Sequence, residues 1–285
     1  MSPTSVSFSR TCLAVLLLVS IVDRARGDWI RDIRGEVSYN DNLSNSDRSP
    51  DRESDFSFDG HVAFGRFGEL TDDLRFSITA DLDARAFAHY EDFNSITIGS
   101  TAALRYRFGL GAMAPFVRVE AGGGYAAFKQ SLQSGGRFHT GLAVGKRLTE
   151  RFAIDASYFY EDIGGEVRVF DRFSHAFALS GSFDLTDKTQ LSAEYELRSG
   201  EVVSYAVPPR PDIVALANDQ RLVGTFGGPY VAYNFDAITN TLSFGVSQAL
   251  TQWVSVNARY EWHYTTRSNI SYMNNVLRLS IHAAF

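Results

Sequence analysis

The chain has 285 residues, of which 45% are hydrophobic and 21% charged, a composition that excludes a disordered protein. The formal net charge of -6 argues against a general nucleic-acid binder. The single cysteine, Cys12, excludes an internal disulfide and a cysteine-rich zinc site. The mean hydropathy is slightly polar, which excludes a bundle of apolar membrane helices.

The first 27 residues have the pattern of a secretory signal peptide. An apolar run over 11–22 is too short for a membrane helix, which needs about 20 residues. Arg10 precedes the run, and Ala25-Arg26-Gly27 follows it with small residues at the positions that a signal peptidase reads. We therefore expect residues 1–27 to be a signal peptide and residues 28–285 to be one mature domain. The alternative is a buried N-terminal helix.

The rest of the chain alternates between apolar and polar residues. In Leu74–Ala86 every apolar side chain falls on one face of a strand and every polar one on the other, and Val254–Tyr264 repeats the pattern. Such runs are about twice as long as the usual globular strand of about 5–6 residues and match the 9–11 residues of a transmembrane strand. We predict twelve strands, roughly at 31–40, 55–67, 73–88, 95–108, 115–128, 135–148, 151–161, 173–185, 188–198, 239–249, 253–264 and 274–285.

The predicted connections differ in length at the two ends of the strands. Short turns begin with Leu-Thr at Leu70, Leu148, Leu185 and Leu250. The connections at the other end are longer and polar, and we expect loops at 41–55, 161–172, 200–238 and 265–274. Short turns on one side and long loops on the other are typical of an outer-membrane barrel.

The last strand resembles the closing strand of bacterial outer-membrane β-barrel proteins of the porin-like kind. Leu277, Leu279, Ile281 and Phe285 share its apolar face and form the predicted sorting signal, whereas Ala283 departs from the aromatic residue preferred there. The resemblance implies an all-β, antiparallel, up-and-down transmembrane barrel of about 12 strands in the outer membrane of a Gram-negative bacterium. It also implies outer-membrane lipid, lipopolysaccharide and the barrel assembly machinery as partners. A soluble β-sandwich or a lipocalin-like barrel is the alternative.

In such a barrel the polar face lines the lumen. Two interpretations of its charges remain open: a network that crosses and fills the lumen, or the lining of a narrow hydrated pore. Basic residues dominate the fourth to sixth strands and acidic residues the seventh to ninth, and we predict that they form opposed walls. The predicted pore-lining residues are Arg75, Asp81, Asp83, Arg85, Arg105, Arg107, Arg118, Glu120, Arg137, Asp155, Glu194, Glu196, Arg259, Glu261 and Arg278.

The long loop 200–238 contains an unusual apolar run at 213–217. Two interpretations are equally favoured. The run forms a short helix that folds into the mouth as a constriction, or it belongs to a lid that packs on neighbouring loops.

The favoured function is a narrow passive pore for small polar solutes. The first alternative is a structural or surface-interaction barrel. It includes an accessory to polysaccharide or surface-protein export, because the stretch 36–42 resembles the opening strand of some export barrels. An outer-membrane hydrolase is a weaker alternative, since no local catalytic signature is present. The six histidines lack metal-ligand spacing, so we expect no catalytic residue, cofactor, metal or nucleic acid. The oligomeric state is not predicted.

Overall fold

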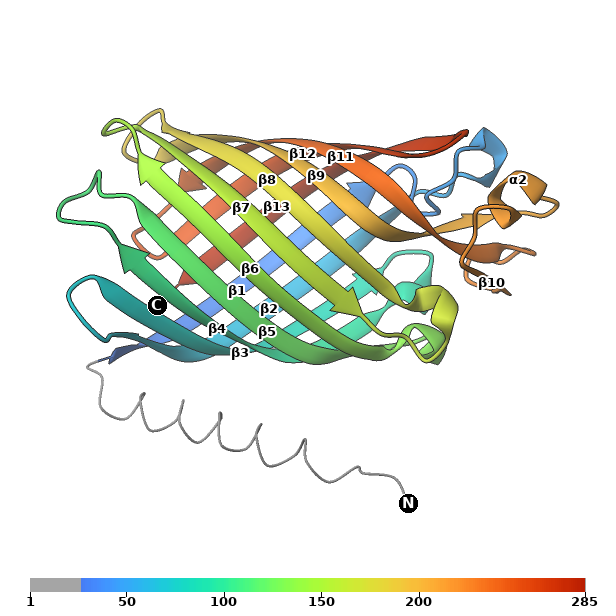
Figure 1. Cartoon of the computed structure of the whole chain (residues 1–285), viewed down its shortest axis with the longest axis horizontal. Helices are drawn as coiled ribbons and strands as arrows, with labels where there is room; N and C mark the ends of the chain where they lie inside the picture. Colours follow the sequence, from blue (N-terminus) through green and yellow to red (C-terminus); the bar gives the residue numbers. More distant parts are fainter. Residues whose placement is uncertain (1–26, 285) are drawn as a thin grey trace, which may run out of the picture.

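The computed structural model describes residues 27–284, and it contains the predicted closed barrel (Figure 1). Twelve antiparallel strands follow one another around the sheet, and the pairing of β1 with β13 closes it. β10 (Asp219–Leu222) is a thirteenth strand that pairs only with β11. The twelve are β1 (Gly27–Asn40), β2 (Asp55–Glu69), β3 (Leu74–Phe87), β4 (Ser95–Arg107), β5 (Phe116–Phe128), β6 (Gly135–Arg147), β7 (Phe152–Ile163), β8 (Arg172–Asp184), β9 (Thr189–Ala206), β11 (Val231–Ala249), β12 (Val254–Arg267) and β13 (Ile270–Ala284).

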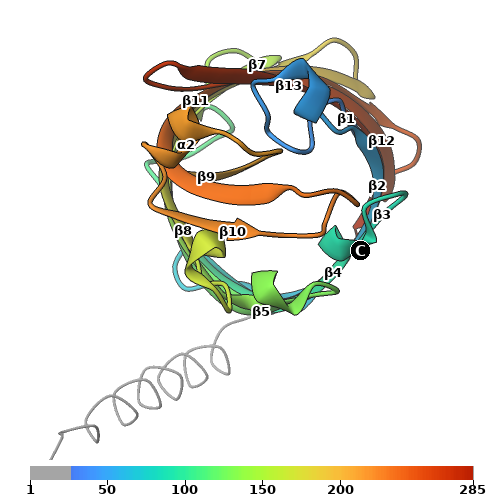
Figure 2. The ribbon, with the colours of Figure 1, turned by 90° about the vertical axis from the view of Figure 1, so that its right-hand side faces the viewer.

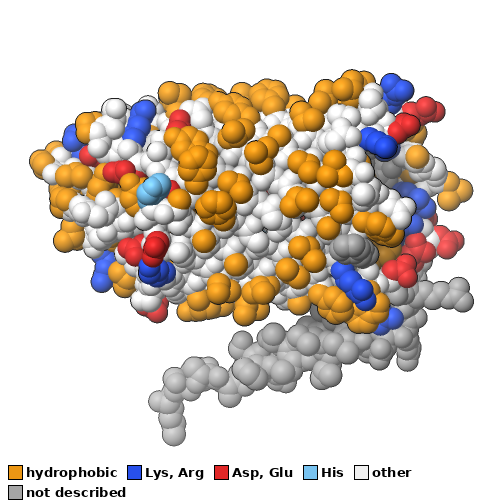
Figure 3. Space-filling view, turned by 180° about the vertical axis from the view of Figure 1, so that it is seen from behind, with side chains coloured by type: hydrophobic (Ala, Val, Ile, Leu, Met, Phe, Trp, Pro, Cys, Tyr) orange, Lys and Arg blue, Asp and Glu red, His pale blue; other side chains and the backbone are white. Residues whose placement is uncertain are grey.

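The alternating pattern determines which face of the sheet meets lipid. Large apolar side chains point outward and are well exposed, for example Ile33, Ile98 and Phe177, which are 50%, 66% and 57% exposed. Figure 3 shows this apolar surface over the middle of the barrel, with charged side chains gathered toward the two ends. Closure satisfies the backbone hydrogen bonds that a strand edge would leave unpaired in lipid. The prediction of a transmembrane-type barrel, rather than a soluble sandwich, is confirmed at the level of fold.

The two ends of the barrel differ as predicted. One end has four-residue turns at 70–73, 148–151, 185–188 and 250–253, and an eight-residue connection at 108–115. The opposite end carries the longer connections, with short 3-10 helices η1 (Ser49–Asp51), η2 (Glu91–Phe93), η3 (Ser131–Gln133) and η4 (Arg168–Phe170). We call it the outer end. No helix within residues 27–284 is long and apolar enough to cross a membrane.

Two of the expected loops are instead continuations of strands. The predicted loop 265–274 is wrong, because β12 and β13 remain paired up to Arg267 and Ile270. Only two residues turn the chain there, and Ser268 takes the left-handed φ of 52° that such a tight turn needs. The loop 200–238 is also shorter than predicted, because β9 and β11 stay paired up to Ala206 and Val231.

Glycines on the inner face of β5 permit close packing. A methyl group at Gly124 would lie 2.4 Å from the backbone oxygen of Ile98 on β4. One at Gly122 would lie 2.4 Å from the imidazole of His139 on β6. Glycine at these positions lets neighbouring groups approach the strand at a distance that any side chain would prevent.

Candidate functional site

The extended ends of β9 and β11 cross the outer mouth of the barrel. We call residues 200–238, which include β10 and the short helix α2 (Pro211–Val214), the cap. The paired segments 200–206 and 231–237 continue the wall by seven residues, about 20 Å of strand. Figure 2 looks into this end and shows the orange strands of the cap running across the ring of the barrel.

An apolar cluster fixes the cap to the far side of the mouth. The ring of Phe226 lies 4.7 Å from that of Tyr90 and 5.5 Å from that of Phe93, between ring centroids. It also lies 5.2 Å from Tyr205 and 5.1 Å from Tyr230 within the cap. Tyr90 and Phe93 belong to the connection between β3 and β4, and β3 stands six places from β9 around the twelve strands. The cap therefore spans the full diameter of the mouth.

Glu53, from the connection between β1 and β2, ties the cap to a second loop. The hydroxyl of Tyr230 donates a hydrogen bond to Glu53 Oε1 at 2.7 Å, and the hydroxyl of Tyr90 donates to Glu53 Oε2. Burial, followed by these bonds to a carboxylate, raises the pKa of Tyr90 to about 12 and also raises that of Tyr230. Both phenols therefore remain neutral donors throughout the physiological pH range.

Arg210 binds the cap to the same connection between β1 and β2. Its side chain is fully buried and forms ion pairs with Asp47 at 2.8 Å and Asp212 at 2.9 Å. The hydrogen bond from Arg210 lowers the pKa of Asp212 to about 2. Beside this clip, the backbone N–H of Tyr205 donates to the carbonyl of Ser44 at 2.8 Å. The contacts of Arg210 with Asp47 and of Tyr205 with Ser44 join segments more than 150 residues apart in the sequence.

The apolar run 213–217 lies at the rim instead of in the lumen. Ile213 of α2 is completely buried against Tyr233 and Phe235 of β11 and against Ile270 and Tyr272 of β13. The hypothesis of a constricting helix is therefore wrong. The alternative of a lid packed on neighbouring loops is confirmed, and the part that crosses the mouth is a hairpin of strands.

Below the cap the barrel encloses a chamber of about 840 Å³. Leu43, Phe93, Phe170, Val203 and Tyr205 line it at its outer end, and charged residues of the strands line its sides. These side walls carry seven arginines, six carboxylates and one histidine. A volume of this size suits a sugar-sized or drug-sized molecule.

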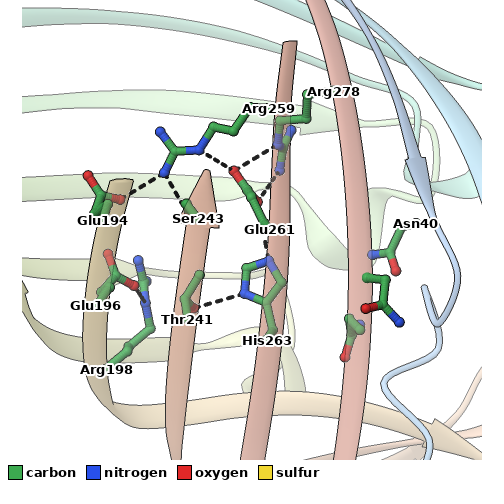
Figure 4. Close-up of polar contacts among 12 residues, drawn as sticks. Asn40, Glu194, Glu196, Arg198, Thr241, Ser243, Arg259, Glu261, His263 and Arg278 are labelled. Carbon is green, nitrogen blue, oxygen red and sulfur yellow. Dashed lines mark hydrogen bonds and ion pairs between the residues drawn. The ribbon is translucent and has the colours of Figure 1, made fainter. Parts of the chain in front are cut away.

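The charges of the wall pair along the wall. Figure 4 shows the largest network, in which Glu194 binds Arg259 at 2.8 Å and Arg259 binds Glu261 at 3.0 Å. Arg278 then binds Glu261 at 3.1 Å and Glu36 at 2.8 Å. Within residues 27–284, every ion pair between barrel strands joins strands that are adjacent or next but one in the sheet. The described charges therefore do not form a network across the lumen, and space remains between the walls.

The fifteen predicted pore-lining residues all lie on inward-facing positions of the strands, at two levels. Six line the chamber: Asp83, Arg85, Arg137, Arg259, Glu261 and Arg278. Nine lie elsewhere along the inner wall. Six of these nine form ion pairs with a neighbour: Glu194 with Arg259, Glu196 with Arg198, Arg118 with Glu120, Arg75 with Glu69, and Arg107 with Asp73 at 4.0 Å. Asp81 accepts hydrogen bonds from two threonines. Arg105 and Asp155 have no ion pair within residues 27–284. Whether a solute contacts them stays a prediction.

The prediction of opposed basic and acidic walls is wrong. β4 to β6 lie directly beside β7 to β9 in the sheet, whereas the strands opposite β4 to β6 are β11 to β13. Several of the acidic groups are also neutralised locally, as in the ion pair between Asp184 and Arg147. The order of the strands in the sequence shows which strands are neighbours. Which strands face each other across the lumen depends on the number of strands in the closed sheet.

The predicted sorting residues Leu277, Leu279 and Ile281 point outward, each about half exposed on β13. Phe285 lies outside the described residues, as do residues 1–26 of the predicted signal peptide 1–27, whose last residue, Gly27, begins β1. Their roles in targeting and assembly stay predictions.

Two kinds of site residue were missed from the sequence. Arg172 was assigned to a loop, although it shares the parity of the inward-facing Ser174 and Ala176, and β8 in fact begins at Arg172. Extending the alternation by one residue would have found it. The cap contacts of Glu53 and Phe226 carry no local signal, because they join loops that are distant in the sequence.

Comparison with known proteins supports the fold. No protein-family model and no curated protein sequence matches the chain. Among solved structures, an outer-membrane channel from Pseudomonas putida F1 is similar over 91% of this chain and 96% of its own, with 13% identity and a TM-score of 0.58. The NanC porin (10% identity, 89% and 98% coverage, TM-score 0.47) and the outer-membrane channel DcaP of Acinetobacter baumannii (8%, 92% and 97%, 0.46) are more distantly similar. This chain thus has the barrel fold of a porin-like outer-membrane channel, as its alternating strands predicted.

Proposed function

We propose that the protein is a passive outer-membrane pore for small polar solutes whose outer mouth is closed by the cap in this conformation. The observation that carries the proposal is the arrangement of the charges, which pair along the wall and leave a polar chamber between the walls. A barrel that served only as a scaffold would gain more from an apolar, filled interior, because ion pairs withdrawn from water contribute little net stability.

The same proposal defines what the barrel contacts in the membrane. The apolar belt contacts outer-membrane lipid, the loops of the outer end contact lipopolysaccharide, and the closing strand is presented to the barrel assembly machinery. The chain acts without chemistry of its own, as a conduit and not as an enzyme.

The cap predicts a specific transport phenotype. Its contacts with the β1–β2 and β3–β4 connections hold it across the mouth, so passage of solute from outside requires that these contacts open or that a narrow path remains beside the cap. We therefore expect the wild-type pore to have a low unit conductance or to open rarely.

Single-channel recording of the refolded protein tests the proposal. The key variant replaces residues 204–233 with Asn-Gly, a two-residue turn that joins Val203 directly to its paired partner Asn234. We expect this cap-deletion variant to conduct continuously, with a time-averaged current at least tenfold above that of the wild type. A shift in gel mobility on heating serves as the control that both proteins are folded barrels.

The recordings also distinguish the alternative functions. Folded barrels that conduct neither with nor without the cap would refute the pore and favour a structural or surface-interaction barrel. Equal currents from the two proteins would show that the pore is open and that the cap does not close it.

A further inference from the structure

The chamber contains three arginines that have no ionic partner. Of its seven arginines, Arg85, Arg198, Arg259 and Arg278 form ion pairs with carboxylates. Arg34, Arg137 and Arg172 form no ion pair or side-chain hydrogen bond with any residue that the structure describes. The Nε atoms of Arg137 and Arg172 are moreover buried and without a hydrogen-bond partner.

Each carboxylate of the chamber, by contrast, has an ionic or hydrogen-bond partner among the described residues. Glu36, Asp59, Glu161 and Glu261 bind arginines, and Asp83 binds His61 at 2.7 Å. Glu201 accepts hydrogen bonds from the backbone of Phe173 and from the amide of Asn218. Among the described residues of the chamber, three arginines have no ionic partner, whereas Glu201 is the one carboxylate with no cation beside it and Asp83 has only His61, so the unpaired charge is mainly positive.

Arg137 and Arg172 stand side by side on one wall. Arg137 of β6 is paired with Ile163 of β7, and Ile163 is paired with Arg172 of β8, so the two arginines lie at one level about 10 Å apart along the wall. Their guanidinium groups repel each other. Bringing two unpaired cations together is costly in a confined space, and an anion between them removes that cost.

Apolar side chains form part of the surroundings of this pair. The guanidinium of Arg137 lies 5.8 Å from the centre of the Phe128 ring, and Ile163 and Phe170 also line the chamber, as does the charged Glu161. Arg34 projects from β1, six places from β7 and thus on the opposite wall. A bound molecule therefore meets guanidinium groups at one wall and an apolar surface beside them.

From this geometry we propose that the chamber holds a binding site for a small organic carboxylate with an apolar body. The carboxylate binds between Arg137 and Arg172, whose forked N–H groups match its two oxygens. The apolar body packs on Phe128, Ile163 and Phe170, and Arg34 faces it from the opposite wall. The inference rests on the proposed pore, because it names the class of solute that the pore admits.

Isothermal titration of the refolded barrel with benzoate tests the site without relying on conductance. The titration is made on the wild type and on the cap-deletion variant, so that a closed cap does not hide the site. We expect the double variant Arg137→Gln/Arg172→Gln to weaken benzoate binding at least tenfold in the cap-deletion background. The matched control is Arg151→Gln, which makes the same chemical change in an exposed turn at the other end and should leave binding unchanged.

Further ligands define the chemistry. Benzamide, which has the same shape without the charge, and inorganic phosphate, which has charge without an apolar body, should both bind at least tenfold more weakly than benzoate. The variant Arg137→Lys/Arg172→Lys keeps the charge without the fork and should fall between the wild type and the glutamine variant. The heat-dependent gel shift verifies that every variant is a folded barrel.

Three outcomes would overturn the inference: no benzoate binding to the cap-deletion variant, equal binding of benzamide, or binding that persists in the folded glutamine variant. Failure of the pore proposal is recognised separately. Arginine-dependent benzoate binding to a barrel that passes no current would retain the site and reject the pore, whereas current without such binding would retain the pore and reject the site.

Discussion

The cap and the chamber wall are held in opposite ways. In the cap, aromatic side chains from distant loops meet around the 8%-exposed Phe226, and the buried side chain of Arg210 pairs with two partly exposed carboxylates. In the wall, charged side chains pair with their neighbours on adjacent strands and remain partly exposed to the lumen. Apolar contact across the mouth closes it, and pairing along the wall keeps the interior open. Under the proposed function, the wall can therefore stay intact while the contacts that hold the cap are broken.

The largest expected effect comes from the centre of the cap. The substitution Phe226→Ala removes a buried ring that contacts four others, at a cost of about 3 kcal/mol to the closed state, equivalent to more than a hundredfold change in the closed-to-open ratio. Single-channel recording should show the open fraction rising accordingly. Leu222→Ala, at a 67%-exposed position in the same cap, is the control and should change nothing. An unchanged open fraction in the Phe226 variant would mean that the cluster does not hold the cap.

Arg210 tests the polar part of the cap. The substitution Arg210→Met preserves much of the side chain's bulk but leaves Asp47 and Asp212 without their cation, which we expect to cost about 1–3 kcal/mol because both carboxylates are partly exposed. Chymotrypsin should then cleave the cap faster, while the barrel itself resists digestion. Arg221→Met on exposed β10 provides the comparison, and equal cleavage of the two variants would contradict the role of Arg210.

Acid should loosen the same clip. The pKa of Asp212 is about 2 in the capped state, against an ordinary value of 3.8, so its ion pair stabilises the cap fully above about pH 4 and loses this effect as the pH falls to about 2. The contribution is on the order of 1 kcal/mol after allowance for solvent screening. Pepsin digestion of the wild type and of Asp212→Asn measures it: the variant should be cleaved faster at pH 4, and the difference should vanish near pH 2. A difference that persists at pH 2 would assign the effect to another group.

The smallest effect is expected from the inner part of the wall. Arg105, whose guanidinium lies 3.8 Å from the centre of the Phe116 ring, has no ion pair in the described chain, whereas Arg118 pairs with Glu120 and Arg107 lies near Asp73. Replacing each of them with glutamine in the cap-deletion background should lower the chloride-to-potassium permeability ratio by about twofold or less, with Arg105 the most effective. Reversal potentials in a salt gradient provide the measurement. Identical potentials for all three variants and for the wild type would show that these arginines do not influence permeation.

The sequence by itself determined the barrel. Alternation assigned an inner and an outer face to each strand, because successive side chains of a strand point to opposite sides, and this was sufficient to place all fifteen predicted charged residues on the inner face. The short turns fixed the antiparallel order in the same local way.

Only the tertiary structure decided how the lumen is used. Three findings depend on closure of the sheet. Closure decides which carboxylates neutralise Arg278, it places β4 to β6 beside β7 to β9 and not opposite them, and it brings Phe226 to Phe93. Closure brings together residues far apart in the chain, and no local pattern records such a contact. The three unpaired arginines are recognisable for the same reason only after every other charge in the chamber has been assigned its partner.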